Sequence, residues 1–189
     1  MNIGHETISR EDPRYPARLV KRLGADAPPG LTALGNLGLL TLTKSALFCS
    51  TRCPGSVILP TYYQAANWRD AERCVISGFH SPVERECLQI LLRGDTPVIL
   101  CPARGMLERL PAQWDIAASG GRMLILSCFP DTSRRVTSEL ASRRNEFVAA
   151  LSDEVYIAYA TAGGNVAALT RRLATWGIPL CRSSLASNV

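Results

Sequence analysis

The 189-residue sequence predicts an α/β fold, an open and mainly parallel sheet with helices on both of its faces. From about residue 45, short apolar segments alternate with longer amphipathic ones, which is the order of strands and helices in such folds. The apolar segments are nearly continuous, as expected for strands covered on both faces. Hydrophobic residues make up 47% of the chain and charged residues 20%, which excludes a disordered protein, and no apolar run is long enough to span a membrane.

The first 44 residues differ from the rest of the chain. Prolines, glycines and charged residues interrupt them, among them Pro13, Pro16 and Pro28-Pro29. We interpret residues 1–44 as an extended N-terminal arm with short turns that packs on the core. Residues 45–189 then form the α/β domain, which is long enough to enclose a sizeable core.

The first half of the α/β domain contains three predicted strands and two predicted helices. Pro82 suits the first turn of the second helix, and Ser81 suits the capping position before it. In chain order these elements are a strand at 46–49, a helix at 58–72, a strand at 74–77, a helix at 82–92 and a strand at 97–101.

The second half continues the alternation. Val136, Leu140, Phe147 and Leu151 recur at helical spacing and predict one apolar face on a long helix. The elements are helical turns at 107–118, a strand at 122–126, a helical segment at 132–151 in one or two pieces, a strand at 155–158, a helix at 165–176 and a short strand at 179–181.

Folds of this class bind ligands beyond the carboxyl ends of their strands. The segments that follow the predicted strands hold hydroxyl groups, arginines and glycines, which together suit an anion. Each loop alone is equally well explained as an ordinary polar loop, but their coincidence at one edge of the sheet favours a phosphate site. The candidate ligand residues in these loops are Ser50, Thr51, Arg52, Gly55, Ser77, Gly78, His80, Ser81, Arg104, Gly163, Gly164 and Asn165.

Arg143 and Arg144 flank the apolar face of the predicted helix at 132–151. Two guanidinium groups beside a buried face need a partner, and a phosphate would serve; the alternative is that both side chains extend to water. Nineteen of the 21 basic residues are arginine, whose planar donors suit phosphate. The net charge of +5 is compatible with a nucleic-acid partner without requiring one.

The seven cysteines argue against a disulfide framework. Their number is odd, and Cys74, Cys101 and Cys181 fall in apolar runs that predict buried strands. Cys49 and Cys53 are the only close pair, and no second pair stands at metal-binding spacing. The N-terminus shows no secretory signal pattern. We therefore expect a cytoplasmic protein with no metal and no cofactor.

Short motifs spread over nearly the whole chain carry a family resemblance. They are Tyr15-Pro16 with Leu19, Pro28-Pro29, Gly35-Asn36, Ser50-Thr51-Arg52, Ser77-Gly78, Arg144-Asn145 with FVAALS at 147–152, and Gly163-Gly164-Asn165. In order and spacing they resemble the DNA-processing protein A (DprA/Smf) family of Rossmann-like proteins. Arg144-Asn145 and the residues after it resemble the start of the family's Arg-Asn-Arg helix and are the most specific part, which adds Asn145 to the candidate site.

The resemblance implies a Rossmann-like fold, single-stranded DNA as the ligand, a RecA-type recombinase as a partner and a homodimer. The sequence departs from the family at several points. Residues 79–84 lack the usual Ala-x-Gly-Ile-Asp run, Glu146 stands in place of the second arginine of Arg-Asn-Arg, and the usual glutamate near Tyr159 is missing. The chain also ends before the position of the family's winged-helix appendage.

We expect a binding protein for a phosphate-bearing ligand, most simply single-stranded DNA, rather than an enzyme. Phe79, Tyr62 and Tyr159 are the candidates for stacking on bases. One alternative is a nucleotide N-glycosidase like the related lysine-decarboxylase-like (LOG) enzymes, of whose Pro-Gly-Gly-x-Gly-Thr-x-x-Glu run only Gly163-Gly164 survives. The other alternative is a sensor that binds a small nucleotide without chemistry.

Overall fold

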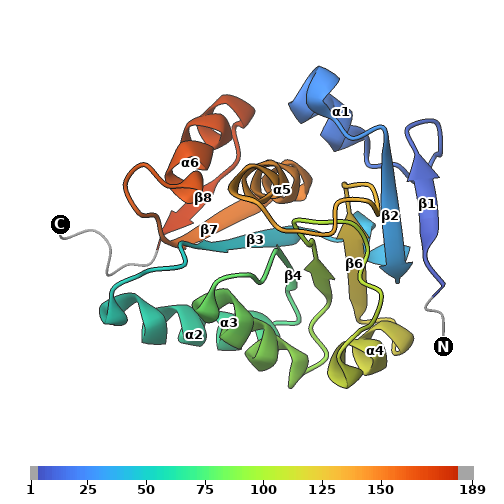
Figure 1. Cartoon of the computed structure of the whole chain (residues 1–189). Coiled ribbons are helices and arrows are strands. Elements are labelled where there is room, and N and C mark those ends of the chain that lie inside the picture. Colours follow the sequence, from blue (N-terminus) through green and yellow to red (C-terminus); the bar gives the residue numbers. More distant parts are fainter. Residues whose placement is uncertain (1–3, 183–189) are drawn as a thin grey trace.

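A single mixed sheet runs through the middle of the molecule (Figure 1). The computed structural model describes residues 4–182, and within this range the sheet has eight strands. The strands are β1 (Glu6–Ser9), β2 (Gly30–Gly35), β3 (Lys44–Cys49), β4 (Cys74–Ser77), β5 (Val98–Leu100), β6 (Met123–Ser127), β7 (Glu154–Tyr159) and β8 (Leu180–Arg182). Their order is β1-β2-β6-β5-β4-β3-β7-β8.

Six neighbouring strands of the sheet run parallel to one another, namely β6, β5, β4, β3, β7 and β8. The strands β1 and β2 run antiparallel to their neighbours. The predicted α/β fold with an open, mainly parallel sheet is therefore confirmed. From β3 the chain proceeds through β4 and β5 to β6 on one side, and β7 then pairs with the other side of β3. The strand order reverses between β3 and β7, so the crevice for a ligand is expected at the carboxyl ends of these two strands.

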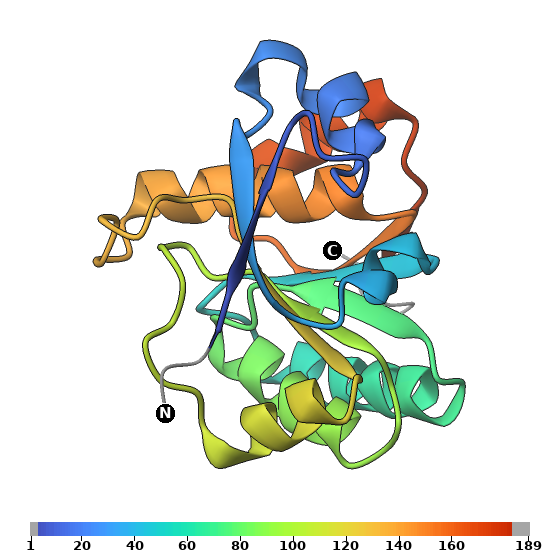
Figure 2. The same cartoon turned by 90° about the vertical axis from the view of Figure 1, so that its right-hand side faces the viewer.

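Helices cover both faces of the sheet and make three layers (Figure 2). The helices α1, α5 and α6 lie on one face, and α2, α3 and α4 lie on the other. Their bounds are α1 (Ala17–Leu23), α2 (Gly55–Asp70), α3 (Pro82–Leu92), α4 (Ala112–Ser119), α5 (Ser138–Leu151) and α6 (Asn165–Trp176), with 3-10 turns at Gly24–Asp26 and Leu37–Thr41.

Each face of the sheet has its own apolar core. Phe48 and Phe147 belong to the core under α1, α5 and α6, whereas Leu47 and Leu88 belong to the core over α2, α3 and α4. Neighbouring residues of β3 thus point into different cores, and all six of its residues are buried. This two-sided burial explains why residues 46–49 of the strand are a continuous apolar run in the sequence.

The first 44 residues contribute α1 and two strands of the sheet, which the sequence analysis did not predict. In β1 only Ile8 is buried, so the strand lacks a visible apolar pattern. The Tyr15 hydroxyl donates to the Pro28 carbonyl at 2.7 Å and ties the start of α1 to the approach to β2. At the end of β2, Gly35 has φ +104, and a Cβ there would lie 2.2 Å from the Met123 carbonyl oxygen, so only glycine allows this approach.

Some predicted boundaries and one burial prediction are wrong. Helix α5 begins at Ser138 instead of residue 132, because Thr137 caps it with a hydrogen bond to the Leu140 N–H. Cys181 is exposed and not buried, because β8 pairs only with β7 and stands at the edge of the sheet. Among the described residues, no helix has the length and apolarity to cross a membrane.

Candidate functional site

A cavity of about 490 Å³ lies at the carboxyl ends of β3 and β7, where the strand order reverses. We call it the switch-point cavity. Four segments line it: the loop after β3, the start of α3, the first turns of α5 and the loop that leads into α6. Of the residues predicted from the sequence, it brings together Ser50, Thr51, Arg52, His80, Ser81, Arg144, Asn145, Gly163, Gly164 and Asn165.

The loops after β3 and β7 hold each other in place. The backbone N–H of Ser50 donates to the Tyr159 carbonyl at 3.0 Å, and the N–H of Thr161 donates to the Ser50 hydroxyl at 2.9 Å. The Thr161 hydroxyl donates in turn to the Arg52 carbonyl at 3.3 Å. The Arg52 side chain makes no ion pair with any described residue, so its guanidinium is available at the rim of the cavity.

The N-terminus of α6 opens into the switch-point cavity. Gly163 has φ +72 and turns the chain so that Gly164 precedes the helix, and no side chain caps the helix. The first N–H groups of a helix have no partner within the helix and carry partial positive charge. Asn165 is held at the entrance by a hydrogen bond of 3.1 Å from its Nδ2 to the Ser138 carbonyl. This end of α6 therefore suits an anion.

The N-terminus of α3 faces the same cavity, but most of the N–H groups there are already bound. The buried Glu84 carboxylate accepts the N–H groups of Cys49 at 2.9 Å, His80 at 2.8 Å and Ser81 at 3.0 Å. The Ser81 hydroxyl accepts the Glu84 N–H and completes a capping box. Ser77 is fully buried and donates to the Leu47 carbonyl. These groups hold the turn between β4 and α3 in shape.

Arg144 is a buried cation without a carboxylate partner. Only 5% of the Arg144 surface is exposed, and burial lowers the pKa of the guanidinium. Nε donates to the Asn145 side-chain oxygen at 2.9 Å and Nη1 to the Cys101 carbonyl at 3.2 Å, while no described residue accepts from Nη2. The Glu84 carboxylate, in the same cavity, opposes this lowering of the pKa but makes no ion pair with Arg144. A buried guanidinium without a direct ion pair is unfavourable, so an anion in the cavity would stabilise it.

Gly78 makes room for this arginine. A Cβ at Gly78 would lie 1.2 Å from Arg144 Nη1, which is closer than any two atoms can approach without a bond. The backbone of the turn after β4 and the guanidinium therefore share a space that a side chain would fill. The glycine of the predicted Ser77-Gly78 turn is required here for packing.

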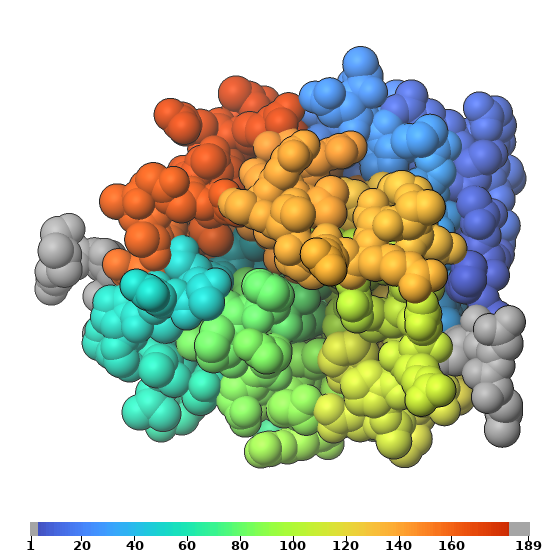
Figure 3. All heavy atoms as spheres, in the orientation of Figure 1, coloured from blue at the N-terminus to red at the C-terminus, as the bar shows by residue number. Residues whose placement is uncertain are grey.

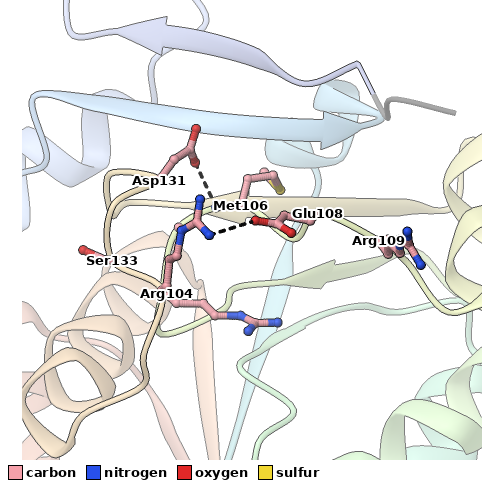
Figure 4. Close-up of a pocket in the computed structure, with 8 residues that line it drawn as sticks. Arg104, Met106, Glu108, Arg109, Asp131 and Ser133 are labelled. Carbon is pink, nitrogen blue, oxygen red and sulfur yellow. Dashed lines mark hydrogen bonds and ion pairs between the residues drawn. The ribbon is translucent and has the colours of Figure 1, made fainter.

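Two further cavities continue from the switch-point cavity along the same edge of the sheet. The second, of about 400 Å³, shares His80 and Arg144 with it and is also lined by Gly78 and Arg104. The third, of about 370 Å³, shares Arg104 and Arg109 with the second (Figure 4). It lies between the loops that follow β5 and β6.

The loops around the third cavity are joined by hydrogen bonds. The Gly105 N–H donates to the Ser133 carbonyl at 3.0 Å, and the Met106 N–H donates to the Asp131 carboxylate at 3.1 Å. Figure 3 shows the two loops side by side on the surface of the molecule. The three cavities thus form a row over the carboxyl ends of β7, β3, β4, β5 and β6.

Three predicted ligand residues lie outside this row. Gly55 and Ser77 line none of the three cavities. Arg143 points away from its neighbour Arg144, lines a separate pocket beside Leu23 and lies over the Phe129 ring at 5.8 Å. Conversely, Ser138 and Thr161 line the switch-point cavity and were not among the predicted residues. Thr161 could have been found because it precedes Gly163 in the same loop, whereas no sequence signal singles out Ser138.

The model of the family DNA recombination-mediator protein A matches residues 6–174. The chain belongs to this family. The predicted resemblance to the DprA family is thereby confirmed, and the match extends through β1, β2 and all six helices to Ala174 in α6.

Solved structures of DprA proteins have the same fold. The protein from Streptococcus pneumoniae superposes with a TM-score of 0.76 at 20% identity, over 94% of this chain and 62% of that chain. DNA processing protein A from Helicobacter pylori, for which a unique single-stranded DNA binding mode is described, superposes with a TM-score of 0.74 at 20% identity, over 96% of this chain and 82% of that chain. The chain thus spans less than two thirds of the pneumococcal protein. No curated protein matches the chain in sequence.

Proposed function

We propose that this DprA-family chain binds single-stranded DNA in DNA processing or recombination, with the phosphates in and beside the switch-point cavity. One observation carries the proposal: the buried Arg144, which has no carboxylate partner among the described residues, lines a cavity that also faces the uncapped N-terminus of α6. Arg52 stands at the same cavity without an ion pair to the described part of the chain. Guanidinium groups and helix N-termini are the donors that proteins use for phosphate.

The row of cavities supports a strand rather than a single nucleotide. The second cavity is lined by Arg85, Arg104, Arg109 and Arg144, and none of them pairs with a carboxylate in residues 4–182. Successive phosphates of a strand would meet successive arginines along this edge of the sheet. The single-stranded DNA binding described for the Helicobacter pylori protein, which shares the fold, supports the same ligand.

An N-glycosidase is supported less well. Among the described residues that line the switch-point cavity, Glu84 is the only carboxylate. Both of its oxygens accept backbone N–H groups, so neither is available to a substrate as the structure stands. A general acid or base has to reach the group that it protonates or deprotonates. The proposal includes a homodimer and a RecA-type recombinase as a partner, which the family resemblance implies. It also includes a cytoplasmic location, which the free cysteines favour.

Fluorescence anisotropy with a labelled single-stranded oligothymidylate tests the proposal. We expect binding that weakens steeply with salt, and an Arg52→Gln variant that binds roughly five- to tenfold more weakly. Arg93→Gln, at the far end of α3, is the matched control because Arg93 is exposed and lines none of the three cavities. The proposal is wrong if binding is absent or insensitive to salt and to Arg52→Gln. Competition by a nucleoside monophosphate at the concentration of the oligonucleotide would favour the nucleotide sensor instead.

A further inference from the structure

We propose that Cys49 and Cys53 are a reversible redox pair, which an oxidant joins as a disulfide across the loop that holds Arg52. We call the two residues the thiol pair. They enclose Ser50, Thr51 and Arg52, three of the residues that line the switch-point cavity. The disulfide itself does not depend on the proposed function, whereas its effect on DNA binding rests on it.

The two thiols of the pair interact with each other. Cys49 ends β3, and Cys53 follows four positions later, just before α2 begins at Gly55. Burial raises the pKa of the Cys49 thiol, and the Cys53 thiol raises it further, in part through a hydrogen bond between the two side chains. Both thiols are free. A disulfide therefore requires the sulfur atoms to approach from hydrogen-bond contact to the ~2 Å of an S–S bond.

The members of the pair differ in their access to solvent. Cys53 is partly exposed, whereas Cys49 is only 4% exposed. The thiolate is the form that attacks an oxidant, and burial keeps Cys49 in its thiol form by raising its pKa. An oxidant therefore meets Cys53 first, and Cys49 is the resolving thiol beside it. An accessible cysteine next to a resolving one is the arrangement found in redox sensors of reducing compartments.

Hydrogen peroxide is an oxidant for which the reaction balances within the pair. The Cys53 thiolate attacks one peroxide oxygen, the O–O bond breaks, and the leaving hydroxide takes up the proton that Cys53 released and becomes water. The Cys49 sulfur then attacks the sulfenic sulfur of Cys53, the S–O bond breaks, and hydroxide leaves as water with the Cys49 proton. Two thiols are oxidised to one disulfide, and one peroxide is reduced to two waters. A dithiol reductant reverses the reaction by exchange.

Cys87 is a third thiol near Cys49, and its environment makes it the less suitable partner. It is fully buried in α3, and its thiol donates to the Thr61 carbonyl at 3.9 Å. Burial, and after it the Glu84 carboxylate, raises the pKa of Cys87 to about 12. Cys53 affects the pKa of Cys49 through a hydrogen bond as well as its charge, whereas Cys87 acts through its charge alone. We therefore assign Cys53 as the partner of Cys49.

The disulfide would change the loop that carries Arg52. In the reduced protein the Arg52 carbonyl accepts the Thr161 hydroxyl at 3.3 Å, and the Ser50 carbonyl accepts the Cys49 thiol at 3.5 Å. Oxidation removes the thiol hydrogen, so the second of these bonds is lost. The approach of Cys53 to Cys49 also shifts Arg52, which is the direct neighbour of Cys53 in the chain. We expect the Arg52 guanidinium to leave its place at the rim of the cavity, which weakens DNA binding.

Tryptic mapping under non-reducing conditions tests the disulfide, because trypsin cuts after Arg52 and separates the two cysteines. The full chain is treated with hydrogen peroxide, and the remaining free thiols are alkylated before digestion. We expect the peptides 45–52 and 53–69 to be joined by a bond that dithiothreitol breaks. Cys87 falls in the peptide 86–93, so a bridge to Cys87 would be recognised by its mass. Absence of the joined peptides, or a bridge to Cys87 in their place, overturns the thiol pair.

Two serine variants show whether any response to peroxide belongs to the pair. Cys53→Ser removes the thiol that meets the oxidant, and its residue lines none of the three cavities. Reduced Cys53→Ser should therefore bind a labelled oligothymidylate like the reduced unmodified protein. Cys181→Ser is the matched control, because Cys181 is exposed and lies at the far edge of the sheet in β8. It should form the same disulfide as the unmodified protein.

Fluorescence anisotropy then measures the effect of the disulfide on binding. Peroxide should weaken binding of the unmodified protein and of Cys181→Ser roughly two- to tenfold, and dithiothreitol should restore it. Cys53→Ser should not respond. A joined peptide with unchanged affinity, or an equal response of Cys53→Ser, overturns the effect on the ligand loop and leaves the proposed function intact. Absence of salt-dependent binding by the reduced protein overturns the proposed function, while the tryptic map still decides whether the disulfide forms.

Discussion

At the scale of single residues, the position of Arg144 depends on the absence of a side chain at Gly78. The glycine leaves the volume that the guanidinium occupies, and the guanidinium reaches the Cys101 carbonyl only across that volume. Both residues were predicted as ligand residues, but their sequence positions do not reveal that one makes room for the other. They are 66 positions apart in the chain, and only the packing of α5 against the turn after β4 brings them together.

Gly78→Ala should therefore displace Arg144 rather than strain the backbone. We expect the free energy of unfolding to fall by about 1–3 kcal/mol, because hydrogen bonds of a buried charged group are disturbed. Denaturant unfolding measures this loss, and a double-mutant cycle with Arg144→Met identifies its cause. In the Arg144→Met background the added methyl group should cost much less. A full cost in that background would show that the backbone of the turn, and not the arginine, rejects the side chain.

At the scale of elements, the buried parallel strands and amphipathic helices were predictable and the edge of the sheet was not. The predicted ranges of β4, α3 and α6 agree with the structure, because their apolar runs or caps mark both ends. The antiparallel strands β1 and β2 were missed because neither shows a regular alternation of apolar and polar residues, and both lie within a segment rich in proline and glycine. The sequence also could not predict that β7 returns to the side of β3, although that pairing creates the switch-point cavity.

Asp153, between α5 and β7, joins three elements at the amino end of the sheet. It accepts the Lys44 N–H at 2.8 Å at the start of β3 and the Arg18 guanidinium of α1 at 2.9 Å. Burial alone would raise the pKa of Asp153, but the Lys44 N–H and the Arg18 guanidinium together lower it below its ordinary 3.8. A carboxylate with a lowered pKa stabilises the fold above its unfolded pKa, and the stabilisation is lost as the pH falls through the folded pKa.

We therefore expect the stability of the protein to decline below about pH 4, with Asp153 as one cause. In Asp153→Asn the decline should be shallower, and the stability at pH 7 should be lower by on the order of 1 kcal/mol after solvent screening. Urea unfolding at a series of pH values measures both effects. Asp95→Asn is the control, because Asp95 is 86% exposed and lies 3.8 Å from Arg122. If Asp153→Asn follows the same pH curve as the unmodified protein, the carboxylate does not contribute in this way.

For the whole molecule, the positions of the arginines are more informative than the net charge of +5. Many arginines elsewhere in the described chain pair with carboxylates, as Arg14, Arg73 and Arg172 do. The arginines that line the switch-point cavity and the second cavity make no such pairs within residues 4–182. A group of arginines without carboxylate partners therefore lies where the strand ends meet the loops, which the composition could not reveal and which favours this edge for a polyanion.

The salt dependence of binding tests this distribution directly. The logarithm of affinity for a single strand falls with the logarithm of salt concentration, by about 0.7 per phosphate neutralised. Arg52→Gln and Arg104→Gln should each reduce the slope by about 0.7, and the double variant by about 1.4, because two exposed residues without shared partners contribute independently. Lys21→Gln/Arg93→Gln removes the same charge from exposed positions that line none of the three cavities, and its slope should match that of the unmodified protein. If both double variants lower the slope equally, the strand responds to overall charge, and the row of cavities is not its path.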